Sequence, residues 1–187
     1  LAGEELVKAY NNEFKNLQYS ILRYFNTYGP NQIAQFVITK FIRNVMNDKQ
    51  PLINGDGKQI RSYNFSEDTA RATVDALLSK KTNNKIMNIG NSKDKINLMQ
   101  LAQLIIKLCG KENKIKFKLN TGYKKADRKK VREIYERYCS TELAKELINY
   151  EPKISLEQGI KKVIKAGVFK PKWATSEKNY TIDDAFN

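Results

Sequence analysis

Asn26 is the first side chain in this sequence whose type and setting suggest ligand binding. It follows a short run of apolar, β-branched and aromatic residues (20–25) and opens a segment rich in turn residues. Such a run suits a strand covered on both faces in a parallel sheet. Open α/β sheets bind ligands beyond the carboxyl ends of their strands. We therefore expect Asn26 to lie in a binding site.

Arg61 and Arg128 are two further candidates, because an arginine presents a planar fork of donors that matches phosphate oxygens. Arg61 follows a Gly-Asp-Gly turn, and Arg128 lies in a polar loop with four lysines. Taken alone, each of these arginines is explained as a solvated surface charge. Their assignment to a site therefore needs support from the surrounding sequence.

The composition excludes several kinds of active site. The sequence contains no histidine, which removes histidine acid–base chemistry, Ser-His triads and nearly every common zinc site. Cys109 and Cys139 are too few for a disulfide framework, and no second ligand cluster lies near either of them in the sequence. We expect no metal site, and we expect a reducing, cytoplasmic location.

The net charge of +14 raises the question of nucleic-acid binding. Only seven arginines are present, and the lysine pairs are scattered along the chain, so dedicated nucleic-acid binding is not favoured. A positive field that attracts a diphosphate ligand remains compatible with this charge. No apolar run approaches the roughly 20 residues that a membrane-spanning helix needs, and the acidic first residues are unlike a signal peptide.

Hydrophobic periodicity and turn residues predict an alternation of helices and strands, which is typical of an α/β fold. The expected helices are 1–16, 33–47, 66–79, 97–109, 139–149 and 155–164, and the expected strands are 17–25, 51–54, 60–65, 85–89 and 115–119. The Gly55-Asp56-Gly57 turn predicts that 51–54 and 60–65 form a hairpin. The expected helix caps are Ser66, Asn97 and Ser155 at N-termini and Gly110 and Asn149 at C-termini.

Several segments, in order along the chain, resemble the NAD-dependent epimerase/dehydratase family, the extended short-chain dehydrogenase/reductases that act on nucleotide sugars. They are Leu1-Ala2-Gly3-Glu4, Arg23-Tyr24-Phe25-Asn26 with Tyr28-Gly29-Pro30, Gly55 to Arg61, Asn88-Ile89-Gly90, Asp127-Arg128, and the stretch from Leu147 to Ile160. Each segment is short, but together they cover residues 1 to about 165 at family-like spacing.

The resemblance implies the C-terminal half only of such a protein: the late part of a Rossmann-like parallel sheet plus a smaller mixed α/β substrate-binding lobe. Residues 1–32 would belong to the cofactor domain. Residues 33–165 would form mainly the nucleotide-sugar-binding lobe, with strand 85–89 returning to the sheet, and 166–187 would be a tail. The family's catalytic Tyr-x-x-x-Lys pair would lie just before residue 1, and the chain has no match to the glycine-rich cofactor turn. The segment would then be inactive alone.

The resemblance also implies roles for individual residues. Asn26 would hydrogen-bond the substrate phosphate or sugar, and Arg61 and Arg128 would contact the diphosphate. Tyr24 and Phe25 would line the nicotinamide pocket. The remaining substrate-binding candidates are Leu52 and Ile53, which would run past the nucleobase, and Asn88.

The preferred hypothesis is therefore the substrate-binding half of an NAD-dependent nucleotide-sugar epimerase/dehydratase, with a sugar 4-epimerase preferred. The family implies NAD, or NADP, bound mainly by an N-terminal half, a nucleotide-diphosphate sugar as substrate, and a homodimer of the full-length protein. Dehydration, decarboxylation and reduction stay open as outcomes. Two other classes also stay open: a non-catalytic nucleotide-sugar-binding module and a basic nucleic-acid-binding protein.

Overall fold

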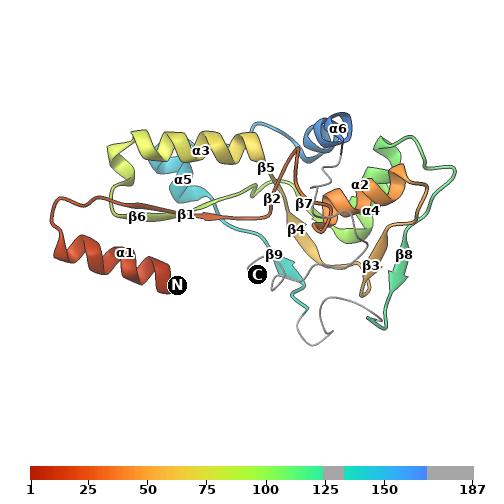
Figure 1. Ribbon diagram of the computed structural model, residues 1–187, viewed down its shortest axis with the longest axis horizontal. Coiled ribbons are helices and arrows are strands. Elements are labelled where there is room, and N and C mark those ends of the chain that lie inside the picture. Colours follow the sequence, from red (N-terminus) through yellow and green to blue (C-terminus); the bar gives the residue numbers. More distant parts are fainter. Residues whose placement is uncertain (124–132, 168–187) are drawn as a thin grey trace.

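A parallel pair of strands organises the part of the structure nearest the N-terminus. The computed structural model describes residues 1–123 and 133–167. β1 (Ser20–Tyr24) pairs in parallel with β6 (Lys85–Ile89), and α3 (Ser66–Leu78) and α5 (Glu142–Ile148) pack on this pair. α1 (Ala2–Glu13) lies on the other side of the pair in Figure 1 and has no buried residue.

Three helices form a second hydrophobic core at the opposite end of the molecule. α2 (Val37–Met46), α4 (Leu98–Leu108) and α6 (Leu156–Ala166) pack against one another, as Figure 1 shows. Each helix places its apolar stripe inward, so this core holds most of the fully buried aliphatic residues. β3 (Leu52–Asn54) and β8 (Lys118–Asn120) form a parallel pair beside this core.

Short strands connect the two ends. β2 (Thr27–Tyr28) pairs in parallel with β5 (Asn64–Phe65). β4 (Ile60–Ser62) lies between β7 (Lys95–Asn97), which is antiparallel to it, and β9 (Glu136–Arg137), which is parallel. A single 3₁₀ turn at Lys80–Thr82 precedes β6. None of the helices in residues 1–123 and 133–167 has the length and apolar character needed to cross a membrane.

The predicted hairpin of 51–54 and 60–65 is wrong. The Gly-Asp-Gly turn forms as expected, with φ values of 86° at Gly55 and 75° at Gly57. Even so, β3 pairs with β8, and β4 pairs with β7 and β9. The physical reason is that a turn fixes the direction of the chain only locally. Both strands pair instead with segments much later in the sequence, β3 along one edge and β4 along both.

Two smaller expectations also need correction, and four are confirmed. Phe65, not Ser66, is the N-cap of α3, because Ser66 is already the first helical residue. β1 is not covered on both faces, since Arg23 and Tyr24 are exposed. The confirmed features are the capping boxes at Asn97 and Ser155, the positive φ of Gly110, and the left-handed conformation of Asn149.

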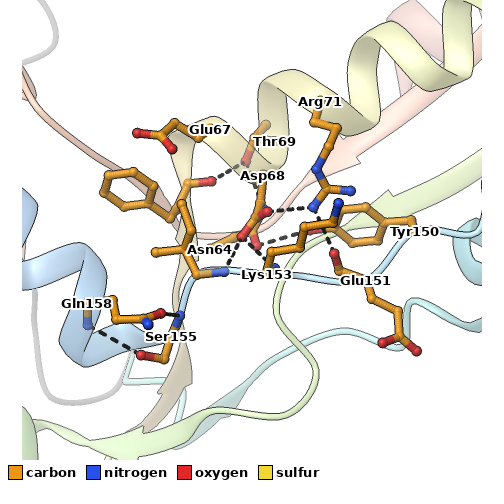
Figure 2. Close-up of polar contacts among 12 residues, drawn as sticks. Asn64, Glu67, Asp68, Thr69, Arg71, Tyr150, Glu151, Lys153, Ser155 and Gln158 are labelled. Atoms are coloured by element: carbon orange, nitrogen blue, oxygen red, sulfur yellow. Dashed lines mark hydrogen bonds and ion pairs between the residues drawn. The ribbon is translucent and has the colours of Figure 1, made fainter.

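The carboxylate of Asp68 joins α3 to the segment that leads into α6 (Figure 2). One of its oxygens accepts hydrogen bonds from the backbone N–H groups of Lys153 (3.0 Å) and Ile154 (2.9 Å). The other accepts from Arg71 Nη2 at 2.5 Å, and the same Arg71 nitrogen donates to the carbonyl oxygen of Glu151 at 2.8 Å. Asp68 is 2 % exposed. A buried carboxylate with three donors therefore holds two distant segments together, and we call these contacts the Asp68 clamp.

Tyr150 extends this connection toward the parallel strands. Its hydroxyl is within hydrogen-bond distance of Asn64 Oδ1 and of the carbonyl oxygen of Gly90, both at 3.0 Å. Asn64 in turn donates to Thr69 Oγ1 at 2.8 Å. Burial raises the pKa of Tyr150 to about 12. The residue thus links β5, the end of β6 and the chain before α6.

Gly159 allows α6 to approach the short strands closely. A Cβ atom at this position would lie 2.1 Å from the Tyr28 hydroxyl and 2.7 Å from Cδ2 of Phe65. Tyr28 donates to the carbonyl oxygen of Leu156 at 3.1 Å, which fixes its ring in that position. The glycine in the stretch from Leu147 to Ile160 is therefore required by packing between α6 and β2.

We predict that Asp68→Ala lowers the free energy of unfolding by about 3 kcal/mol, because two backbone N–H groups and Arg71 lose a buried charged acceptor. Urea unfolding of the wild type and the variant, followed by circular dichroism, measures this difference in the free energy of unfolding. Glu67→Ala is the matched control, since the neighbouring Glu67 is exposed and pairs with Lys162 (2.8 Å), and this substitution should lower the free energy of unfolding by less than about 1 kcal/mol. Equal losses in the two variants would contradict the role of the Asp68 clamp.

We predict that Tyr150 contributes to the loss of stability in strong alkali. Its pKa is raised from 10.0 to about 12 on folding, so the folded state favours the neutral phenol. That contribution is complete below pH 10 and is lost as the pH rises toward 12. Tyr150→Phe should therefore show a shallower fall in unfolding free energy across this window than the wild type. Tyr10 is exposed, so Tyr10→Phe should show the same fall in unfolding free energy with pH as the wild type. A Tyr150→Phe variant that also falls as steeply as the wild type would refute the prediction.

Candidate ligand-binding site

Asn26 lies at the turn between β1 and β2, with both ends of its carboxamide bonded. Its Nδ2 donates to the carbonyl oxygen of Ser62 at 2.9 Å, and its Oδ1 accepts from Arg137 Nη2 at 2.9 Å. The backbone adopts a φ of 38°, a left-handed conformation that asparagine tolerates better than most residues. Its carbonyl oxygen also accepts from the N–H of Asn64 at 3.2 Å. The end of β1 is thus fixed against β4 and β5.

Arg61 is buried, with 8 % of its surface exposed. Its guanidinium donates to the carbonyl oxygens of Ile60 (2.8 Å), Ile134 (2.7 Å) and Tyr135 (3.3 Å), and it pairs with Glu133 at 3.5 Å. Most of the donor fork is therefore directed at the chain around β9. In this structure Arg61 anchors that segment beside β4.

Arg137 is a residue of this site that the sequence did not predict. It lies on β9 directly opposite Arg61 in the parallel register, and its side chain is exposed. Burial raises the pKa of Tyr63, and the nearby charges of Arg61 and Arg137 oppose that rise, so both cations act on one region. A two-residue strand carries no periodicity, and only its long-range pairing with β4 brings Arg137 to Asn26.

The proposed nucleobase strand has one exposed and one buried side chain. Leu52 is 42 % exposed, whereas Ile53 is 1 % exposed and belongs to the hydrophobic core. Asn54 Oδ1 accepts from Asn120 Nδ2 at 2.9 Å, which secures β3 against β8. A ligand passing this strand would meet the side chain of Leu52 and, at Ile53, only the backbone.

The remaining candidates are not joined to Asn26 by side-chain contacts. The Tyr24 hydroxyl lies 2.9 Å from Thr73 Oγ1 on α3, and Phe25 packs beside Gly90. Asn88 Nδ2 donates to the carbonyl oxygen of Ser140 at 3.3 Å. Arg128 lies outside the described residues. The structure thus joins Asn26 to Arg137 by a hydrogen bond, and Arg137 lies opposite Arg61 in the pairing of β4 with β9.

A second group of cations lines a cavity of about 370 Å³ next to Tyr138. Lys93 and Lys145 both bond to the carboxylate of Glu151, at 3.4 Å and 2.8 Å. Lys95 Nζ lies 3.6 Å from the centroid of the Tyr138 ring, a cation–π contact. The carboxylate of Glu151 therefore partly compensates the charges of Lys93 and Lys145, and the ring of Tyr138 attracts Lys95. Among the residues that the structure describes, no cluster of carboxylates, cysteines or histidines could hold a metal ion.

Comparison with known proteins gives this arrangement a family context. Residues 1–90 match the model of the NAD dependent epimerase/dehydratase family. The chain is 33% identical to a UDP-glucuronate 4-epimerase of Thermodesulfobacterium geofontis over 162 residues, which are 87% of this chain and 47% of that protein. The chain is homologous to NAD-dependent nucleotide-sugar epimerases and dehydratases.

Solved structures agree with this assignment. The crystal structure of UDP-glucose 4-epimerase from Thermotoga maritima with UDP-glucose superposes with a TM-score of 0.75 at 27% identity, covering 88% of this chain and 50% of that one. UDP-glucuronic acid 4-epimerase from Bacillus cereus, in complex with UDP-glucuronic acid and NAD, superposes with a TM-score of 0.73 at 29% identity, covering 88% and 49%. The chain therefore has the α/β fold of these epimerases and spans about half the length of the relatives it matches.

The expectation that the chain is the C-terminal half only is wrong. The family model matches residues 1–90, which contain the parallel pair of β1 and β6. The matched region therefore corresponds to the Rossmann half of the family's proteins, and the chain is not assigned to their C-terminal half.

The described residues do not by themselves form a site that fits NAD. Tyr24 and Phe25 can offer ring and backbone contacts, but the Tyr24 hydroxyl is occupied by Thr73. The sequence contains no glycine-rich turn that could surround the cofactor's diphosphate. We therefore assign no chemical step to these residues through the cofactor.

We predict that Asn26→Ala lowers the free energy of unfolding by about 2 kcal/mol. About 1 kcal/mol comes from the lost side-chain hydrogen bonds, and about 1 kcal/mol comes from holding alanine in a left-handed backbone conformation. Asn26→Gly loses the same amide contacts, but glycine adopts a positive φ without steric cost. The glycine variant should therefore be at least as stable as the alanine variant in urea unfolding. A more stable alanine variant would show that the backbone at this turn is unstrained.

Proposed function

We propose that the protein to which this chain belongs is an NAD-dependent enzyme that modifies a nucleoside-diphosphate sugar, and that it acts as a sugar 4-epimerase. The observation that carries this proposal is the hydrogen bond between Arg137 and Asn26 at the end of a parallel strand, with Arg61 opposite Arg137 in the pairing of β4 with β9. The resemblance to epimerases solved with UDP-sugars supports the same substrate class. The proposal also includes that the full-length protein forms a homodimer.

In this proposal the chain grips the substrate and orients it. Asn26 hydrogen-bonds the diphosphate or the sugar, and its fixed carboxamide limits the positions the ligand can take. Arg61 either contacts the diphosphate itself or positions β9 so that a residue of that strand makes the contact. Arg128 is proposed as a further residue that contacts the diphosphate. The nucleobase runs past Leu52 and the backbone of Ile53, and Asn88 completes the proposed substrate-binding residues.

The chemistry that NAD supplies when bound is transient oxidation of a sugar carbon. Tyr24 and Phe25 are proposed to contribute ring and backbone contacts near the nicotinamide. The chain contains no histidine and no Tyr-x-x-x-Lys pair, so the proton transfer is not assigned to any residue of this sequence.

The proposed reaction is tested by incubating the protein with NAD and a panel of UDP-, GDP- and dTDP-sugars. An epimerase gives a product of unchanged mass and inverted configuration, which mass spectrometry and proton NMR identify together. Loss of water or carbon dioxide would replace the epimerase with a dehydratase or decarboxylase. Tight binding of a UDP-sugar with no product would favour a non-catalytic binding module.

We predict that Arg61→Ala weakens UDP-sugar binding by about 1.5–3 kcal/mol, the range for a lost charged hydrogen bond. Isothermal titration calorimetry of the two proteins measures the difference. Arg43→Ala is a matched control, because Arg43 is an exposed residue of α2. Unchanged affinity in Arg61→Ala would remove Arg61 from the site.

A further inference from the structure

We propose that Arg137 binds an anionic oxygen of the nucleotide sugar, either on the diphosphate or on a carboxylate carried by the sugar. The proposal rests on the proposed function and adds a ligand-binding residue to the same site. It arises from the tertiary arrangement, in which an exposed guanidinium lies beside the candidate carboxamide of Asn26.

The donors of Arg137 are largely available to a ligand. A guanidinium carries five N–H donors, and Nη2 of Arg137 donates one of them to Asn26 Oδ1 at 2.9 Å. This contact holds one side of the fork against Asn26 and leaves the other N–H groups directed elsewhere. Because the side chain is exposed, an anion that contacts Asn26 can also reach Arg137.

The charge of Arg137 is compensated less than that of its neighbour. Arg61 pairs with Glu133 at 3.5 Å, and the side chain of Glu133 is 6 % exposed. Within residues 1–123 and 133–167, no carboxylate forms an ion pair with Arg137. The adjacent Glu136 instead accepts from the Tyr138 hydroxyl at 3.0 Å. A positive charge is therefore left beside Asn26, where an anionic ligand would supply the missing partner.

The backbone under Arg137 is held in place before any ligand arrives. Arg61 bonds to the carbonyl oxygens of Ile134 and Tyr135, just ahead of β9, and the N–H of Ile60 donates to the carbonyl oxygen of Tyr135 at 2.6 Å. A guanidinium on an anchored strand loses less conformational freedom on binding than one on a free loop. The anchoring by Arg61 therefore serves the placement of Arg137.

The other cations near this strand are weaker candidates. Lys93 and Lys145 share the carboxylate of Glu151, and Lys95 lies over the ring of Tyr138. A lysine also lacks the planar fork that binds two oxygens of one phosphate or carboxylate. Arg137 is thus the described cation best suited to bidentate recognition at Asn26.

The test measures binding of UDP, UDP-glucose and UDP-glucuronate to the wild type and to Arg137→Gln by titration calorimetry. Loss of a charged hydrogen bond predicts an affinity about ten- to a hundredfold weaker. If the diphosphate is the partner, all three ligands weaken alike. If a sugar carboxylate is the partner, only UDP-glucuronate weakens. Arg137→Lys, which keeps the charge without the fork, should show an intermediate loss for the same ligands.

The controls separate this inference from the proposed function. Arg43→Gln removes an exposed arginine of α2 and should bind like the wild type, and circular dichroism should show the same fold in all variants. Wild-type affinities in Arg137→Gln would overturn the role of Arg137 while leaving the proposed function intact. A wild type that binds none of the three ligands would refute the proposed function and this inference with it.

Discussion

The guanidinium of Arg61 bonds to a carbonyl oxygen 73 positions further along the chain, and the candidate site depends on that contact. A buried arginine must satisfy its donors, and here the carbonyl oxygens around β9 and the carboxylate of Glu133 satisfy them. The requirement draws β9 against β4. Arg137 is then opposite Arg61 and within reach of Asn26.

The Asp68 clamp meets the same kind of requirement elsewhere in the molecule. A carboxylate that is 2 % exposed is balanced by Arg71 and two backbone N–H groups from the chain before α6. Tyr150 and Gly159 continue the connection, the first through hydrogen bonds and the second by leaving room for Tyr28. The two hydrophobic cores are thus linked by buried polar groups as well as by the chain itself.

Local chemistry made several parts of this fold predictable. Asn97 and Ser155 begin helices because their side chains accept from a backbone N–H three residues on, and that geometry needs no distant partner. The apolar run before Asn26 indicated a strand in a parallel sheet, and β1 does pair in parallel with β6. The family was recognisable from short segments, although the assignment to a C-terminal half was wrong.

The sequence by itself determined the helix caps at Asn97, Ser155 and Asn149, the α/β alternation and the nomination of Asn26 and Arg61 as candidate ligand contacts. It could not determine which strand edges meet, because a hydrogen-bonding edge is the same for every partner and the turn at Gly55-Asp56-Gly57 constrains only its neighbours. The tertiary structure decided that β3 joins β8 and that β4 joins β7 and β9. It also placed Arg137 beside Asn26, because burial of Arg61 requires acceptors that only a distant segment supplies.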